Sequence, residues 1–223
     1  MNIEKAGEKT SHAILILDAS GSMSSIKDKT IKSVNEFIQA QKTSTIPTYI
    51  SFITFSNNEV KTIIDYKPAY MVEELTDKDY STYGMTNLLD AVGTVISKVN
   101  SSLKSINDLT LRPSVIISIV TDGGENSSKE YNYENIKKHV AECEKNNWAF
   151  LFLGANIDAF AESAKLGFGT SNTMQYDVDK IDTAVTMMSN ATELLKASRS
   201  MGVDVSVAYT QGLISDEDRK SVV

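Results

Sequence analysis

The sequence predicts an α/β fold, in which a doubly wound and mostly parallel sheet has helices on both faces and one antiparallel strand at its edge. Three apolar runs, at residues 13–17, 115–120 and 148–153, indicate strands that are buried on both sides. Segments whose apolar residues recur at helical spacing separate these runs. Such alternation is typical of parallel sheets, which bind ligands beyond the carboxyl ends of their strands.

In the first half of the chain, helix and strand patterns alternate as this fold requires. Apolar side chains at helical spacing predict a helix over residues 25–43, and residues 49–55 indicate the strand that follows it. Residues 56–58 are typical of a turn, and residues 60–66 indicate a returning hairpin strand, antiparallel and at an edge of the sheet. Residues 67–85 show little periodicity, so we expect a longer connection there.

The second half of the chain repeats the pattern with shorter connections. Gly167 is a helix stop signal, because glycine adopts the left-handed conformation that ends many helices. The expected helices cover residues 88–99, 133–143, 158–166 and 178–195, and the expected strands cover residues 115–120, 148–153 and 173–176.

One domain is expected to account for most of the chain. It spans residues 12–199 and follows a polar N-terminal segment at residues 1–11. From Ser200 the periodicity weakens, although residues 203–207 alternate as in a short strand. We therefore expect residues 200–223 to form a C-terminal tail, which is a candidate interaction element.

Composition and charge exclude several classes of function. The 223 residues are 41% hydrophobic and 23% charged, which is ordinary for a globular domain. A net charge of -7 argues against nucleic acid as a partner, because binding to phosphates needs a basic surface. The longest apolar run is far shorter than a membrane span, and the N-terminus lacks an apolar signal core. We expect a cytoplasmic protein with no membrane partner, and the sequence leaves its oligomeric state open.

Three loops at predicted strand ends or helix starts carry an unusual set of oxygen donors. Asp18, Ser20 and Ser22 follow the first strand, Thr86 precedes a helix, and Asp122 follows the strand at residues 115–120. Each residue alone has an ordinary interpretation as a helix cap or a turn residue. Carboxylate and hydroxyl oxygens are also the ligands that hard divalent cations prefer. Their occurrence together at these positions predicts a metal site.

The same five residues resemble a known motif. The Asp-x-Ser-x-Ser sequence at residues 18–22, Thr86 before a helix and Asp122 after an apolar strand match the metal-ion-dependent adhesion site of von Willebrand factor type A domains. The expected order of elements agrees with the fold of that family. Residues 84–91 and 150–158 resemble its small single-domain members from bacteria and phages, so the host cytoplasm or a virion is also an expected location.

The resemblance implies a role for each residue of the motif. Ser20 and Ser22 would bind the metal directly, Thr86 directly or through water, and Asp18 and Asp122 through bound waters. Mg²⁺ is the expected cation, with Mn²⁺ or Ca²⁺ as alternatives. A remaining coordination position would accept an Asp or Glu carboxylate from a protein partner. The resemblance therefore implies a metal-dependent protein-interaction module and not an enzyme.

Three further residues are candidates for the surroundings of the metal. Asp90 lies one turn into the helix that follows Thr86, where it either contacts the hydroxyls of the site or only favours the helix N-terminus. Glu125 extends the Asp122 loop and is a candidate for the rim. Tyr83 lies at the mouth of the Thr86 loop and is a candidate for the partner surface.

Two other functions remain open at this point. Haloacid-dehalogenase-like phosphohydrolases also place an aspartate at the end of the first strand, but they need a second carboxylate two residues later as general acid. Ser20 occupies that position here and cannot supply the proton. The chain is alternatively a structural subunit of a phage or bacterial assembly, in which the metal only stabilises the loops.

Overall fold

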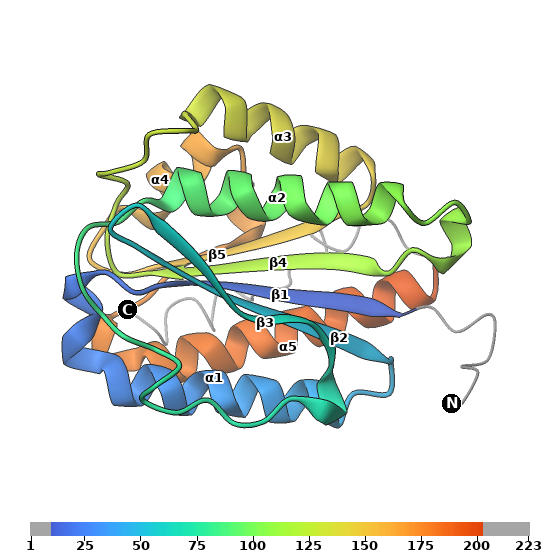
Figure 1. Cartoon of the computed structure of the whole chain (residues 1–223), viewed down its shortest axis with the longest axis horizontal. Helices are drawn as coiled ribbons and strands as arrows, with labels where there is room; N and C mark the ends of the chain where they lie inside the picture. The colour runs from blue at the N-terminus through green and yellow to red at the C-terminus, as the bar shows by residue number, and fades with distance from the viewer. Residues whose placement is uncertain (1–9, 203–223) are drawn as a thin grey trace.

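The computed structural model describes residues 10–202 of the chain, which form one mixed sheet between two layers of helices (Figure 1). The alternating residues 203–207 and most of the predicted tail lie outside the described residues. The strands of the sheet are β1 (Ser11–Asp18), β2 (Thr48–Ser56), β3 (Glu59–Pro68), β4 (Ser114–Thr121), β5 (Ala149–Gly154) and β6 (Thr173–Gln175).

The strand order in the sheet is β3-β2-β1-β4-β5-β6, and every neighbouring pair is parallel except β2 and β3. This confirms the predicted doubly wound sheet with one antiparallel edge strand. The β2–β3 hairpin turns at Asn57 and Asn58, whose φ angles are 49° and 65°. Two successive residues with positive φ are typical of the tight turns that match the twist of a hairpin, and asparagine tolerates this conformation.

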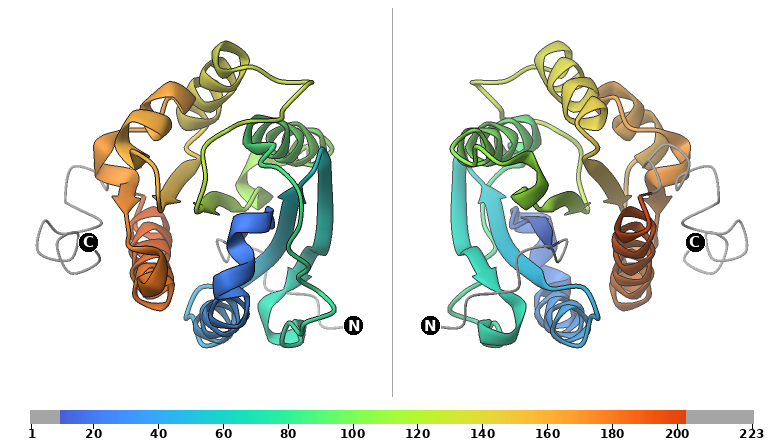
Figure 2. Two further views of the ribbon diagram at one scale, coloured as in Figure 1. Left: turned by 90° about the vertical axis from the view of Figure 1, so that its left-hand side faces the viewer. Right: turned by 90° about the vertical axis from the view of Figure 1, so that its right-hand side faces the viewer.

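Within residues 10–202, five α-helices cover the two faces of the sheet (Figures 1 and 2). Ile14 and Ile16 of β1 point into the core shared with α2, α3 and α4, whereas Ala13 and Leu15 point into the core shared with α1 and α5. Both faces of the strand are therefore buried, which explains its unbroken apolar sequence. The helices are α1 (Lys27–Lys42), α2 (Leu88–Lys104), α3 (Tyr133–Lys145), α4 (Ala159–Leu166) and α5 (Ile181–Ser200).

The observed bounds differ from the sequence prediction at the starts of two helices and at the ends of two helices. The helix expected from residue 25 begins at Lys27, and a 3₁₀ helix covers Gly21–Ile26. The Ser24 hydroxyl donates a hydrogen bond to the Gly21 carbonyl oxygen, and such local bonds of serine compete with regular helix geometry. The last helix likewise begins at Ile181, after a 3₁₀ turn at Val178–Lys180.

The ends of α2 and α5, at Lys104 and Ser200, lie five residues beyond the predicted ends at residues 99 and 195. Gly167 ends α4 in the left-handed conformation, with φ 96°, as predicted. Within residues 10–202, no helix is long and apolar enough to cross a membrane.

Candidate metal centre

The predicted ligands meet at the carboxyl ends of β1 and β4, which are neighbours in the middle of the sheet. From β1 the chain moves outward to β2 and β3, and from β4 it moves in the opposite direction to β5 and β6. The sheet therefore reverses its strand order between β1 and β4, which is where doubly wound folds bind ligands. The left panel of Figure 2 looks onto this end of the sheet.

The loop after β1 brings four of the five candidates together. The Ser20 backbone N–H donates to Asp18 Oδ1 at 2.7 Å, which folds the loop back over the strand end. The Ser20 and Ser22 hydroxyl oxygens lie 3.1 Å apart. The Ser22 hydroxyl donates to Asp122 Oδ1 at 2.6 Å, and this bond joins the loop after β1 to the loop after β4.

The Thr86 loop is fixed between the other two loops. The Gly21 N–H donates to the Gly84 carbonyl oxygen at 3.0 Å. On the other side, the Asn126 N–H donates to the Thr86 carbonyl oxygen at 3.0 Å, and the Thr86 N–H donates to Asn126 Oδ1 at 2.8 Å. A Cβ atom at Gly123 would lie 3.5 Å from Thr86 Oγ1, so the threonine hydroxyl faces the loop that carries Asp122.

Both carboxylates of the site are buried. Asp18 is 0% exposed and Asp122 is 3% exposed. Burial raises the pKa of Asp18 to about 6, hydrogen bonds from Thr121 and Ser20 offset part of this rise, and the charge of Asp122 adds to it. Burial also raises the pKa of Asp122. Ionising two buried carboxylates close together is costly, and a cation bound between them would lower this cost.

The donor set fits a hard divalent ion. Asp18 and Asp122 supply carboxylate oxygens, and Ser20, Ser22 and Thr86 supply hydroxyl oxygens. Within residues 10–202, no group of three or more His, Cys, Asp or Glu side chains could hold a metal, so a cation site there has to include other donors such as hydroxyl oxygens. Ser22 is exposed whereas the other four candidates are buried, which gives the site one face toward solvent. Oxygen-only donors with a solvent-facing side suit Mg²⁺, Mn²⁺ or Ca²⁺.

Asp90 and Glu125 support the site through its loops. The Asp90 carboxylate accepts the backbone N–H groups of Lys129, Glu130 and Tyr131 at 2.9, 2.9 and 3.0 Å. Its bonds thus go to the segment before α3 and not to the hydroxyls that we considered from the sequence. The Glu125 carboxylate accepts the Leu89 N–H at 2.9 Å, which satisfies a free donor at the N-terminus of α2.

Tyr83 lies beside the site as an exposed side chain. Its backbone N–H donates to the Ala19 carbonyl oxygen at 2.8 Å, and its hydroxyl donates to Glu59 Oε2 at 2.8 Å. The side chains of Tyr83 and Met85, on either side of Gly84, are 46% and 52% exposed. The loop therefore presents two large apolar groups next to Thr86.

Sequence reasoning did not assign roles to two residues that support Asp18. The Thr121 hydroxyl donates to Asp18 Oδ2 at 2.6 Å, and its position directly before Asp122 at a strand end was the available signal. The buried Tyr80 hydroxyl donates to the Asp18 carbonyl oxygen at 2.6 Å. Tyr80 lies in the long connection without periodicity, which gave no signal for its burial.

Comparisons with known proteins identify the family and the fold of the chain. The family model of the von Willebrand factor type A domain matches residues 13–193. No curated protein sequence matches the chain significantly.

Several solved structures share the fold at low sequence identity. One is the proximal thread matrix protein 1 of the mussel byssus with a zinc-occupied MIDAS motif, at 14% identity and a TM-score of 0.58; the match covers 82% of this chain and 45% of that one. The manganese-loaded TRAP protein of Plasmodium vivax matches at 17% identity and a TM-score of 0.55, covering 80% of this chain and 72% of that one. The pilus adhesin SpaC of Lactobacillus rhamnosus GG matches at 10% identity and a TM-score of 0.63, covering 83% of this chain and 30% of that one.

The matched structures share the fold over only part of their own length. The chain corresponds to less than half of the mussel protein, and identities of this size establish a shared fold alone. The family model, in contrast, covers most of the chain, because its match begins in β1 at residue 13 and ends in α5 at residue 193. The chain belongs to the von Willebrand factor type A domain family.

Proposed function

We propose that the chain is a metal-dependent protein-interaction module that performs no catalysis. A divalent cation, Mg²⁺ in the first instance, is held by Asp18, Ser20, Ser22, Thr86 and Asp122. The cation binds an Asp or Glu carboxylate of a protein partner at its solvent-facing position.

The observation that carries this proposal is the convergence of these oxygen donors from three loops at the reversal of strand order. Ser22 bonds to Asp122 across the loops, and the backbone of Thr86 is fixed by Asn126. With only two carboxylates against a dication, the loaded site is about neutral. A partner carboxylate can then take a coordination position that the ligands of the chain leave open, without meeting a net negative charge.

The surroundings of the site suit a protein surface as the partner. Tyr83 and Met85 remain about half exposed although their loop is held by backbone hydrogen bonds. Large exposed apolar side chains next to a polar centre are typical of interaction surfaces. We propose that these two side chains pack against the residues that flank the partner's carboxylate.

The position of Ser20 speaks against the phosphohydrolase alternative. A general acid two residues after the first-strand aspartate would have to be a carboxyl group, and the serine hydroxyl is not acidic enough to protonate a leaving group. The serine lies 3.1 Å from the Ser22 hydroxyl, where both oxygens can serve as metal ligands instead. The zinc-occupied motif of the mussel protein and the manganese-loaded TRAP protein also support a metal in this site.

The cytoplasmic location remains a prediction from the sequence.

Affinity capture from cell lysate, followed by mass spectrometry, tests the proposal. We expect the immobilised chain to retain a partner in Mg²⁺ and to release it in EDTA. The variant Asp122→Asn keeps the shape of the side chain but removes its charge, so it should fail to retain that partner. Asp77→Asn is the matched control, because Asp77 is an exposed carboxylate outside the site.

Two results would contradict the proposal. The first is a specific partner that stays bound in EDTA and binds Asp122→Asn equally well. The second is Mg²⁺-dependent hydrolysis of p-nitrophenyl phosphate that disappears in Asp18→Asn, because this would show an enzyme.

A further inference from the structure

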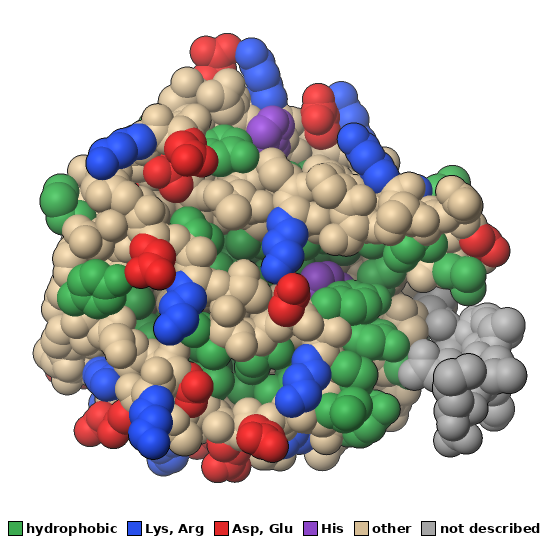
Figure 3. Space-filling view, in the orientation of Figure 1, with side chains coloured by type: hydrophobic (Ala, Val, Ile, Leu, Met, Phe, Trp, Pro, Cys, Tyr) green, Lys and Arg blue, Asp and Glu red, His purple; other side chains and the backbone are tan. Residues whose placement is uncertain are grey.

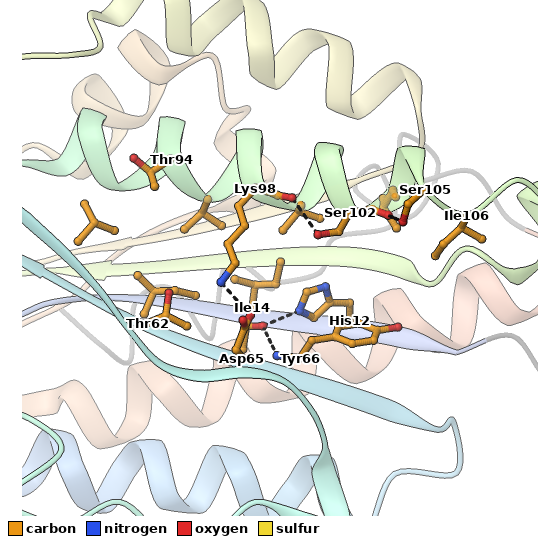
Figure 4. Close-up of a pocket in the computed structure, with 16 residues that line it drawn as sticks. His12, Ile14, Thr62, Asp65, Tyr66, Thr94, Lys98, Ser102, Ser105 and Ile106 are labelled. Carbon is orange, nitrogen blue, oxygen red and sulfur yellow. Dashed lines mark hydrogen bonds and ion pairs between the residues drawn. The ribbon is translucent and has the colours of Figure 1, made fainter.

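A cavity lies on the α2 face of the sheet, away from the metal centre. It has a volume of about 320 Å³ and lies between the second half of α2 and the strands β1, β2 and β3 (Figure 4). Figure 3 shows hydrophobic side chains within a hollow on this face of the molecule. Its β1 residues, His12 and Ile14, are at the amino end of the strand, whereas Asp18 is at the carboxyl end. The cavity is therefore separate from the proposed cation site.

Short side chains and an irregular strand pairing explain the hollow. β3 contributes Val60 and Thr62 to its wall, and α2 contributes Val95 and Val99. The pairing of β2 with β3 shifts register between Ile50 and Ile53. Such irregularities bend the edge of a sheet, and small β-branched residues do not fill the space below a helix. Aliphatic side chains thus share the walls with threonine and serine side chains such as Thr94 and Ser102, and the exposed wall is more apolar than polar.

His12 contributes a polar ring to this mainly apolar cavity. The residue is 5% exposed, and its Nε2 atom lies 2.8 Å from the Ser51 hydroxyl oxygen. Ser51 is fixed in turn by the Tyr66 backbone N–H, which donates to it at 3.0 Å. Figure 4 shows the imidazole ring pointing from β1 toward α2. Among the residues that the structure describes, none forms a hydrogen bond with its other ring nitrogen, Nδ1.

An ion pair spans the mouth of the cavity. Lys98 Nζ on α2 lies 2.9 Å from Asp65 Oδ1 on β3, and the two side chains are 47% and 62% exposed. Exposed ion pairs of this kind contribute little to stability, so the mouth can open at low cost. Because these two charges already neutralise each other, the cavity offers no unpaired charge to an ionic ligand.

We propose that this cavity binds a compact, uncharged and mainly apolar molecule that carries one hydroxyl group, of the phenol class, with the hydroxyl hydrogen-bonded to His12 Nδ1. The volume lies at the lower end of the range for small-molecule sites, which are mostly apolar with a few placed polar groups. Burial lowers the pKa of His12 to about 4, so the ring is neutral near pH 7. A hydroxyl both donates and accepts, and it therefore satisfies Nδ1 in either tautomer of the neutral ring.

The probe pair p-cresol and p-xylene tests this proposal on the full chain. The two molecules have nearly the same shape, and only p-cresol has a hydroxyl. We expect p-cresol to shift the backbone NMR signals of residues around the cavity, such as Ile14, Ser51 and Val99, in a saturable manner. It should bind about threefold to tenfold more tightly than p-xylene, which is the effect of one net hydrogen bond.

Two variants assign the binding to this cavity. His12→Phe keeps a ring but removes the polar atom, so p-cresol and p-xylene should bind it equally well. Thr62→Trp adds a large ring on the cavity side of β3 and should abolish binding of both probes. Lys61→Trp is the matched control, because Lys61 faces the other side of the strand. Melting curves of each variant identify any that fail to fold.

Three outcomes would overturn the proposal. Wild-type chain that binds both probes equally would show an apolar hollow without recognition of a hydroxyl. Signal shifts that persist unchanged in Thr62→Trp would place the probes elsewhere. Binding of p-cresol only after deletion of residues 1–9 or 203–223 would show that a segment of the chain occupies the cavity.

Discussion

The buried carboxylate of Asp18 is the residue on which the metal site depends most. It receives hydrogen bonds from the Ser20 N–H and the Thr121 hydroxyl, at 2.7 and 2.6 Å. These neutral donors do not overcome the cost of burial, since the pKa of Asp18 remains raised to about 6. A dication would favour the ionised carboxylate far more strongly than these hydrogen bonds. The proposed cation thus explains why two aspartates are placed together in this interior.

Asp122→Asn measures the part that charge plays at the site. The amide oxygen can still accept the hydrogen bond from Ser22, so the loops should keep their arrangement. Loss of the negative charge should weaken Mn²⁺ binding about 10–100-fold, the range found when groups that orient bound ligands or waters are removed. Isothermal titration calorimetry checks this, with Asp77→Asn as the control. Equal Mn²⁺ affinities of the wild type and Asp122→Asn would show that the charge of Asp122 does not contribute to metal binding.

At the scale of elements, the site depends on three loops that are held together by backbone hydrogen bonds. Gly84 is central, because its carbonyl oxygen accepts the Gly21 N–H and the flanking Tyr83 N–H bonds to Ala19. Gly84 has φ +74°, and a Cβ atom there would lie 2.5 Å from the Asn57 Cβ atom. Both the conformation and the close approach require glycine.

Gly84→Ala should therefore destabilise the fold and weaken metal binding together. Gly202→Ala is the matched control, since Gly202 has φ +79° but a Cβ atom added there would meet no other atom of residues 10–202 within 4 Å. The control carries the cost of the left-handed conformation alone. We expect Gly84→Ala to lose about 1–3 kcal/mol more, which is the usual cost of overpacking. Urea unfolding measures both variants, and equal losses would show that Asn57 moves aside freely.

Secondary structure was predictable where the periodicity was strong. The apolar runs of β1, β4 and β5 and the stripe along α2 led to the correct elements, because burial on both faces of a strand or one face of a helix leaves a clear pattern. The burial of Tyr80 was not predictable, because it lies in an irregular segment whose contacts are set by the fold and not by local spacing. The family motif indicated the five candidate ligands, whereas the partners of Asp90 depend on a loop conformation that no motif encodes.

At the scale of the whole molecule, two separate cores hold helices on either side of the sheet. Polar residues also join the layers. Lys196 on α5 is buried and donates to Gln41 Oε1 on α1 at 2.8 Å and to the Thr48 hydroxyl on β2 at 3.0 Å. Burial lowers the pKa of this lysine, and the hydrogen bond and the charge of Glu193 partly offset this fall. On the opposite face, His12 is buried in the neutral form.

His12 should make the fold less stable in mild acid. Burial lowers its pKa from 6.5 to about 4, so the unfolded chain binds a proton between these pH values that the folded chain does not. Stability should therefore fall as the pH drops from about 6.5 to about 4, by about 3 kcal/mol from this residue. Urea unfolding at several pH values checks this, with His12→Phe as the reference for all other groups. If the stabilities of the two proteins fell in parallel with pH, His12 would not be the source of the loss of stability in acid.

Paramagnetic broadening by Mn²⁺ in the backbone amide NMR spectrum tests the central claim most directly. Mn²⁺ broadens the signals of nuclei near its binding site, so it reports the location of the cation as well as its binding. We predict that the signals of residues 18–22, 84–87 and 121–123 disappear first at substoichiometric Mn²⁺, and that excess Mg²⁺ restores them. Broadening that begins at other acidic surface residues, or that leaves these three loops unaffected, would contradict a metal centre at Asp18.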